Sequence, residues 1–119
     1  MPMRIAVPAS GPSVNDQVDT RFERAPFIIF ITPETGEISH KLNPCALERG
    51  GLEPHIVQFL IKNQVTHLIA PRIVGHANNA LLAAGILVFL WEGSGSVSSA
   101  LKRFNIGNLT LMAENPHAS

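Results

Sequence analysis

A single cysteine and five histidines supply the thiolate and imidazole groups of this chain that could bind a transition metal. Cys45 lies in an irregular stretch, where it is either a partly buried loop thiol or a soft thiolate ligand for a metal such as copper. His76 is the strongest histidine candidate, because it lies beside Gly75 in a predicted loop that enters a helix. A lone cysteine excludes an intramolecular disulfide and a multi-cysteine zinc or iron–sulfur site built from this chain alone. The metal-ligand candidates are therefore Cys45 and His76.

Arginines gather in the stretches that are expected to form loops. They are Arg21, Arg24, Arg49 and Arg72. Several of these loops lead into helices, whose first N–H groups and positive dipole end suit an anion. Carboxylates lie in the same stretches, so an ion pair between Arg21 and Asp19 is as consistent with the sequence as a ligand contact. The same holds for Arg24 and Glu23. We therefore expect an anionic ligand at these loops.

The sequence lacks the residue patterns of the common catalytic and nucleotide-binding sites. The predicted strands at 4–7, 27–32, 66–70 and 86–90 contain no carboxylate, whereas metal-dependent nucleases need several that converge on paired cations. No pattern places a histidine beside Cys45 as a catalytic base. The Gly93-Ser-Gly95 stretch before a helix imitates a dinucleotide fingerprint, but the third glycine is absent, and there is no Walker A motif. We therefore expect a protein that is not an enzyme.

Hydrophobic patterning predicts the elements that must position these residues. Strands are expected at 4–7, 27–32, 37–42, 66–70 and 86–90, with an optional short strand at 109–113, and helices from about residue 52, over 78–84 and over 97–104. The second and third strands form an antiparallel hairpin, and the later alternation of strand and helix implies parallel strands. We expect a single α/β domain over residues 1–113, with a central mixed five-stranded sheet, about three helices and a loose tail at 114–119. Ligands of such folds bind at the carboxyl ends of the parallel strands.

Length and composition favour a folded protein. The chain has 119 residues, of which 45% are apolar and 15% charged, and this balance disfavours disorder. Nine basic and nine acidic residues cancel, so the basic excess of a nucleic-acid-binding module is absent. The first residues do not resemble a signal peptide, and the longest apolar stretch, residues 80–91, is too short to span a membrane. We expect a cytoplasmic protein that binds neither nucleic acid nor membrane.

Six short motifs occur in a fixed order along the chain. They are Met3-Arg-Ile-Ala-Val-Pro8, Val18-Asp-x-Arg-Phe-x-Arg-Ala25, Pro33-Glu-Thr-Gly-Glu37, Asn43-Pro44, Gly50-Gly51 and Ala83-Ala-Gly-Ile86. With them the chain resembles the dinitrogenase iron–molybdenum cofactor biosynthesis family, the small NifX-like proteins, over nearly its whole length. The resemblance implies a ribonuclease H-like fold with a mixed five-stranded sheet. It also implies binding or carrying of molybdenum-containing metal–sulfur clusters rather than catalysis.

One branch of this family, the orange proteins, holds a mixed Mo–Cu sulfide cluster without covalent attachment. Such an anionic cluster brings its own sulfide ligands, so the protein must supply positive charge, N–H donors and apolar cover. The chain resembles this branch more than a protein built to ligate bare iron. It departs from the family at Glu23 and Pro71, where glycine is usual, and at Val74-Gly-His-Ala77, where Gly-Pro-Asn-Ala is usual. These departures fall in the ligand loops, and His76 offers an imidazole there.

The leading hypothesis is a non-enzymatic carrier of a molybdenum-containing, Mo–Cu or related Mo/Fe sulfide cluster, held at the carboxyl edge of the parallel strands. Protein partners in cofactor assembly are implied by the family. The expected contacts are Ser10, Arg21, Arg49, Gly50, Gly51, Arg72, Gly75, His76, Asn78 and Gly93, with Cys45 and His76 as candidate direct ligands. A metal-free protein–protein adaptor in metallocofactor assembly or cell-division control is the main alternative, and a small hydrolase or nuclease is the third.

Overall fold

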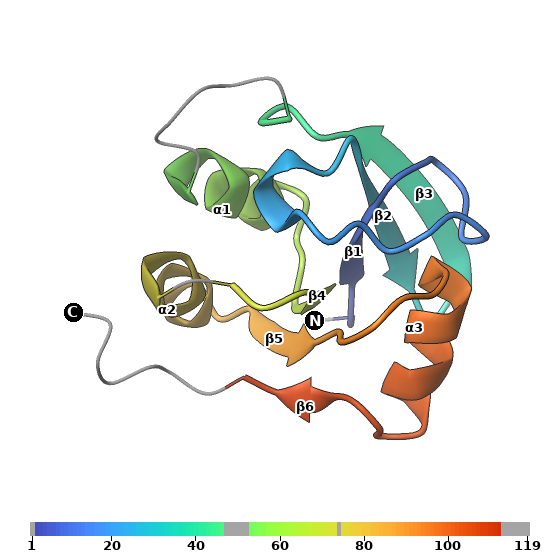
Figure 1. Cartoon of the computed structure of the whole chain (residues 1–119). Coiled ribbons are helices and arrows are strands. Elements are labelled where there is room, and N and C mark those ends of the chain that lie inside the picture. The colour runs from blue at the N-terminus through green and yellow to red at the C-terminus, as the bar shows by residue number, and fades with distance from the viewer. Residues whose placement is uncertain (1, 47–52, 74, 113–119) are drawn as a thin grey trace.

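A computed structural model describes residues 2–46, 53–73 and 75–112, with the backbone alone at 53, 54, 75 and 76 (Figure 1). The elements in chain order are β1 (Ile5–Ala9), the 3-10 turn η1 (Phe22–Arg24), β2 (Phe27–Thr32), β3 (Glu37–Leu42), α1 (Glu53–Lys62), β4 (His67–Ala70), α2 (Gly75–Ala83), β5 (Leu87–Leu90), α3 (Val97–Asn105) and β6 (Thr110–Leu111). The predicted α/β class and the predicted order of elements are confirmed.

The strands of the described residues form one mixed sheet in the order β3-β2-β1-β4-β5-β6. The pairs β1–β4 and β4–β5 are parallel, whereas β1–β2, β2–β3 and β5–β6 are antiparallel. The expected five strands are wrong by one, because Thr110 and Leu111 pair with Leu90 and Phe89 and add a sixth strand. This strand lies within 109–113, where the sequence offers an optional short strand. Two residues show no alternation of their own, so the pairing with β5 decides that it forms.

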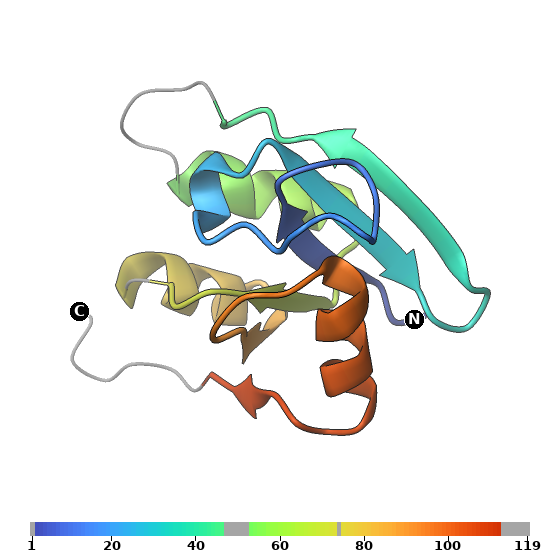
Figure 2. The same ribbon diagram turned by 45° about the vertical axis from the view of Figure 1, so that its right-hand side comes forward.

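Helices cover both faces of the sheet, with α1 and α2 on one face and α3 on the other (Figures 1 and 2). The α1/α2 face has a core that includes Phe30, Leu60 and Leu81. The α3 face has a second core that includes Ile29 and Trp91. β1 is buried along its whole length, as expected of a central strand with both faces covered.

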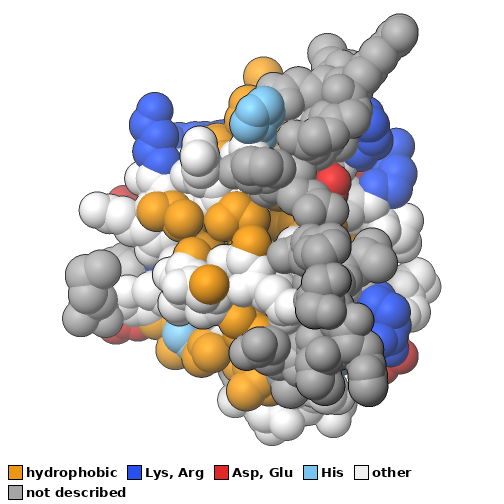
Figure 3. Space-filling model, turned by 90° about the vertical axis from the view of Figure 1, so that its left-hand side faces the viewer, with side chains coloured by type: hydrophobic (Ala, Val, Ile, Leu, Met, Phe, Trp, Pro, Cys, Tyr) orange, Lys and Arg blue, Asp and Glu red, His pale blue; other side chains and the backbone are white. Residues whose placement is uncertain are grey.

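Figure 3 views the molecule from the side on which α1 and α2 lie, where hydrophobic side chains gather in the middle and charged ones lie at the margins. α2 adds no Asp, Glu, Lys or Arg to this side of the molecule, because its sequence contains none of them. Among the described residues, no helix combines the length and apolar character needed to cross a bilayer.

β1 runs to Ala9, although the sequence predicts that the strand ends before Pro8. The carbonyl of Pro8 accepts a hydrogen bond from the backbone N–H of Asp19 at 3.0 Å, so it points away from β2. Since the N–H and C=O of a strand residue point to the same side, the missing N–H of proline also lies away from β2. The β1–β2 ladder therefore loses no hydrogen bond at this position.

The helix boundaries follow local signals at some ends and tertiary packing at others. Ser96 is the N-cap of α3, as predicted: its hydroxyl accepts the N–H of Ser99 at 3.1 Å. Gly85 follows α2 with a φ of +82°, which suits the predicted C-terminal glycine. α2 begins at Gly75, however, three residues before the predicted start at Asn78. Ala77 is buried in the α1/α2-side core, and this packing holds a first turn that has no capping signal.

Candidate cofactor-binding site

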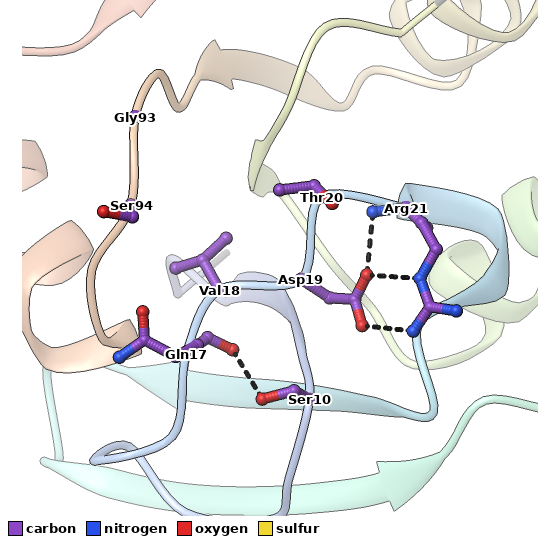
Figure 4. Close-up of a pocket in the computed structure, with 8 residues that line it drawn as sticks. All are labelled: Ser10, Gln17, Val18, Asp19, Thr20, Arg21, Gly93 and Ser94. Atoms are coloured by element: carbon purple, nitrogen blue, oxygen red, sulfur yellow. Dashed lines mark hydrogen bonds and ion pairs between the residues drawn. The ribbon is translucent and has the colours of Figure 1, made fainter.

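The loops that follow β1, β4 and β5 meet at one edge of the sheet, because the parallel strands all end there. A pocket of about 320 Å³, here called the edge pocket, opens between the first and third of these loops (Figure 4). It is lined by Ser10, Gln17, Val18, Asp19, Thr20, Arg21, Gly93 and Ser94. A smaller pocket of about 150 Å³, the side pocket, is lined by Arg21, Phe22, Glu23, Arg72 and Ile73. Arg21 belongs to both pockets, so the two adjoin.

Backbone hydrogen bonds hold the segment 17–19 between the end of β1 and the loop that joins β5 to α3. The N–H of Ser10 donates to the carbonyl of Gln17 at 3.0 Å, and Ala9 and Val18 form an antiparallel bridge. On the other side, the N–H of Val18 donates to the carbonyl of Gly95 at 2.9 Å. The wall of the edge pocket is therefore a fixed part of the structure, although it carries no regular element.

The N-terminus of α3 is closed by the same loop, which corrects the expectation that it receives an anion. Each of the three N–H groups of its first turn has a partner inside the protein. Val97 donates to the carbonyl of Asp16 at 2.9 Å, Ser98 to the carbonyl of Val14 at 2.8 Å, and Ser99 to the hydroxyl of Ser96 at 3.1 Å. An anion at this edge must therefore be bound by other groups.

Asp19 and Arg21 form an ion pair at the rim of the edge pocket (Figure 4). Nε and Nη2 of Arg21 lie 3.1 and 2.9 Å from the two carboxylate oxygens, and the backbone N–H of Arg21 donates to the same carboxylate at 2.8 Å. Burial raises the pKa of Asp19, but the hydrogen bonds and charge of Arg21 outweigh it and hold the pKa below its usual range. The same carboxylate raises the pKa of Arg21.

Several donors around the two pockets are unused by the described part of the chain. The backbone N–H groups of Thr20, Gly93 and Ser94 make no hydrogen bond to a described residue, and neither does Nη1 of Arg21. Arg72 is exposed and makes no ion pair or hydrogen bond within those residues. These groups can donate to an anion without breaking a hydrogen bond of the protein.

Four of the predicted site residues meet at these pockets. Ser10 and Gly93 line the edge pocket, Arg72 lines the side pocket and Arg21 lines both. Ser10 also donates from its hydroxyl to the carbonyl of Gln17 at 3.3 Å. The ion pair of Arg21 with Asp19, which the sequence left open beside a ligand contact, is present.

The remaining predicted contacts lie elsewhere or outside the described residues. Asn78 is 2% exposed and lines neither pocket. The backbone of Gly75 and His76 forms the start of α2, and the side chain of His76 lies outside the description. Arg49, Gly50 and Gly51 also lie outside the described residues.

Cys45 belongs to the α1/α2-side core and is completely buried. Its backbone N–H donates to the side-chain oxygen of Asn43 at 3.0 Å, and the amide of Asn43 in turn donates to the carbonyls of Glu23 and Ala25. The burial favours the interpretation of Cys45 as a packed thiol over that of an accessible ligand. The hydrogen bonds of Asn43 account for the asparagine of the Asn43-Pro44 motif, since they join this stretch to η1 and to Ala25.

Five residues that line the edge pocket are not among the contacts predicted from the sequence: Gln17, Val18, Asp19, Thr20 and Ser94. A signal for the first four was present, because they flank or fall within the Val18-Asp-x-Arg-Phe motif. The structure shows what that motif does: Asp19 holds Arg21, and Phe22 anchors η1 in the core. Among the described residues, no group of three or more His, Cys, Asp or Glu side chains is placed to hold a metal ion.

Comparison with known proteins identifies relatives of the whole fold. The chain is similar to the apo form of the orange protein from Desulfovibrio gigas, with 31% identity, 96% of each chain covered and a TM-score of 0.88. It is also similar to an NMR structure from Thermotoga, proposed to be a NifB protein, with 33% identity, 97% of this chain and 100% of the other covered, and a TM-score of 0.78. No curated protein sequence matches the chain. The sequence model of the family described as dinitrogenase iron-molybdenum cofactor matches residues 1–107, and the chain therefore belongs to this family.

Proposed function

We propose that this protein is a non-enzymatic carrier that holds an anionic molybdenum-containing sulfide cluster, of the Mo–Cu type, at the edge and side pockets. Family membership and the likeness to the orange protein support a cofactor-binding or carrier role. The Mo–Cu identity of the cluster and action in the cytoplasm, with protein partners in cofactor assembly, are parts of the proposal. The ribonuclease H-like assignment also stays a prediction.

The observation that carries the proposal is the meeting of unused donors at the two adjoining pockets. Arg72, Nη1 of Arg21 and the N–H groups of Thr20, Gly93 and Ser94 come from three different loops. Sulfide anions accept hydrogen bonds, so such donors suit a cluster that already carries its metal ligands. A bare metal ion would need several protein ligands, and the described residues offer no such group.

The charge balance at the pockets assigns different roles to the two arginines. The carboxylate of Asp19 offsets the charge of Arg21 and takes two of its guanidinium nitrogens. Arg21 is therefore an oriented hydrogen-bond donor, whereas Arg72 makes no ion pair within the described residues and supplies a positive charge beside Glu23 in the side pocket. Arg49, Gly50, Gly51, Gly75 and His76 remain proposed contacts, while Cys45 could act as a ligand only if the core around it opened.

The proposal is tested by an anaerobic titration of the apo protein with tetrathiomolybdate and copper. Visible absorption reports binding, and gel filtration reports whether Mo and Cu elute with the protein at a fixed ratio. Arg72→Ala is expected to weaken binding by about tenfold or more, because a hydrogen-bonded charge contributes about 1.5–3 kcal/mol. Lys102→Ala is the matched control, since Lys102 is an exposed cation on α3 that lines neither pocket. Colour that elutes as a small molecule would contradict the proposal and favour the adaptor hypothesis.

A further inference from the structure

β3 is an edge strand whose outer edge is unpaired within the described residues. It pairs with β2 over six consecutive positions, from Glu37 opposite Thr32 to Leu42 opposite Phe27, and contains no proline. Thr32 and Pro26 direct their carbonyls towards the β3 side, where they accept the N–H groups of Gly36 and Asn43. Since backbone directions alternate along antiparallel strands, positions 37, 39 and 41 face β2. The backbone groups of Ile38, His40 and Leu42 therefore point outward.

The side chains of the same three residues share the α3 face of the sheet, since Ile38 lies opposite Ile31 and His40 opposite Ile29 in the core of that face. α3 does not cover this end of the sheet, as Figure 2 shows. Ile38 is 54% exposed and Leu42 is 70% exposed. One edge therefore combines unpaired backbone groups with exposed apolar side chains, which is the combination that favours strand addition.

The charges on the other face of β3 have partners within the chain. Nζ of Lys41 donates to Oδ1 of Asn63 at 2.6 Å, and Glu37 lies 4.0 Å from the guanidinium of Arg4. The strand carries one positive and one negative charge, so two copies side by side do not repel each other. In an antiparallel pair, Glu37 of each copy comes near Lys41 of the other.

We propose that β3 pairs with β3 of a second copy of this chain, antiparallel about a two-fold axis at His40. In this register Ile38 lies opposite Leu42 of the other copy, and His40 lies opposite itself. The outward N–H and C=O groups of the three residues then form six hydrogen bonds, two for each opposed pair. The two sheets join into one continuous sheet.

The alternative register, centred on Ser39, explains less of the structure. It places Glu37 directly opposite Lys41, but both residues already have contacts in their own chain. It also leaves Leu42 without an apolar partner. Only the register centred on His40 gives both Ile38 and Leu42 an apolar neighbour across the interface. An identical strand supplies these neighbours, because Ile38 of each copy lies opposite Leu42 of the other.

The expected association is weak, because a six-residue strand pair buries less surface than a stable dimer interface of about 1,200–2,000 Å². Sedimentation equilibrium from micromolar to millimolar concentration tests it. The average mass of the wild type should rise from one chain towards two. Leu42→Lys should weaken association by about tenfold or more, because it removes the apolar contact with Ile38 of the other copy and places a charge against that side chain. Ile106→Lys is the matched control, since Ile106 is 76% exposed and lies away from β3.

Cysteine cross-linking tests the register. Opposed residues of a hydrogen-bonded pair have Cα atoms about 5.5 Å apart, within the span of a disulfide. His40→Cys should therefore form a covalent dimer under mild oxidation, whereas Leu111→Cys should not. The buried Cys45 does not interfere. Cross-linking of Ser39→Cys instead of His40→Cys would overturn the register.

A wild type that stays monomeric at millimolar concentration would overturn the proposal and leave the edge to the strand of another protein. Equal association of wild type and Leu42→Lys would also overturn it, because association would then occur at another surface. Leu42 and Ile106 are exposed, so the two lysine variants should fold, and circular dichroism checks that they do. Neither result bears on cluster binding, since β3 lines neither pocket.

Discussion

The loop of residues 10–21 and the edge strand β3 differ in a way that their backbones alone do not suggest. The loop is irregular, yet its backbone is tied to β1, to the Gly95 carbonyl and to the first turn of α3. β3 is regular, yet its outer hydrogen-bonding groups have no partner in the described residues. A regular strand can therefore leave backbone hydrogen-bonding groups without a partner, and an irregular loop can have its backbone held by hydrogen bonds.

The difference follows from where each segment lies in the sheet. The loop crosses the ends of central strands, where buried backbone groups must find partners inside the protein. β3 lies at the sheet's end, where water can serve its outer groups. The loop is therefore suited to hold a ligand in a fixed geometry, and β3 is suited to add a strand.

Among the substitutions in these two regions, Asp19→Ala is expected to cost the most stability. The carboxylate of Asp19 is buried and accepts three hydrogen bonds from Arg21, so we expect a loss of about 2–3 kcal/mol in the free energy of unfolding. Leu42→Ala on β3 is the control and should change it by no more than about 0.5 kcal/mol. Urea unfolding measures both. Equal effects would show that the loop is no better anchored than the edge strand.

Acid should weaken the loop through the same carboxylate. The pKa of Asp19 in the folded protein lies below its usual value of 3.8, so the unfolded chain binds a proton more readily than the folded one. The stability from the ion pair is therefore present above pH 3.8 and is lost as the pH falls through the folded pKa. Urea unfolding at several pH values should show the gap between wild type and Asp19→Asn closing only below pH 3.8. A difference in the free energy of unfolding that stayed constant with pH would show that this ion pair does not contribute to the loss of stability in acid.

The smallest expected effect concerns the junction between the loop and α3. Ser96→Ala removes the hydroxyl that accepts the N–H of Ser99, and we expect a loss of about 1 kcal/mol. Ser98→Ala is the matched control, because the N–H of Ser98 donates to the Val14 carbonyl and its hydroxyl makes no hydrogen bond to another described residue. Thermal unfolding can resolve the two. A loss at Ser98 as large as that at Ser96 would contradict a specific capping role.

Sequence reasoning predicted the elements whose signals are local. The hairpin, the cap at Ser96 and the glycine after α2 depend on residues a few positions apart, and all three are confirmed. It was incomplete or wrong where a distant partner decides the outcome. The optional strand at 109–113 forms as β6 because it pairs with β5. β1 continues past Pro8, contrary to the prediction, and the N–H of Asp19 donates to the carbonyl of Pro8.

The same division applies to the site. Short motifs were enough to place the chain in its family. The expectation that ligands bind at loops after the parallel strands selected Ser10, Arg21, Arg72 and Gly93, which line the two pockets. Only the tertiary structure decided that the N-terminus of α3 is closed and that Asn78 and Cys45 are buried. The physical reason is that a hydrogen-bonding group is free or occupied according to what packs against it. In this fold the residues that pack against the site come from loops that are far apart in the chain.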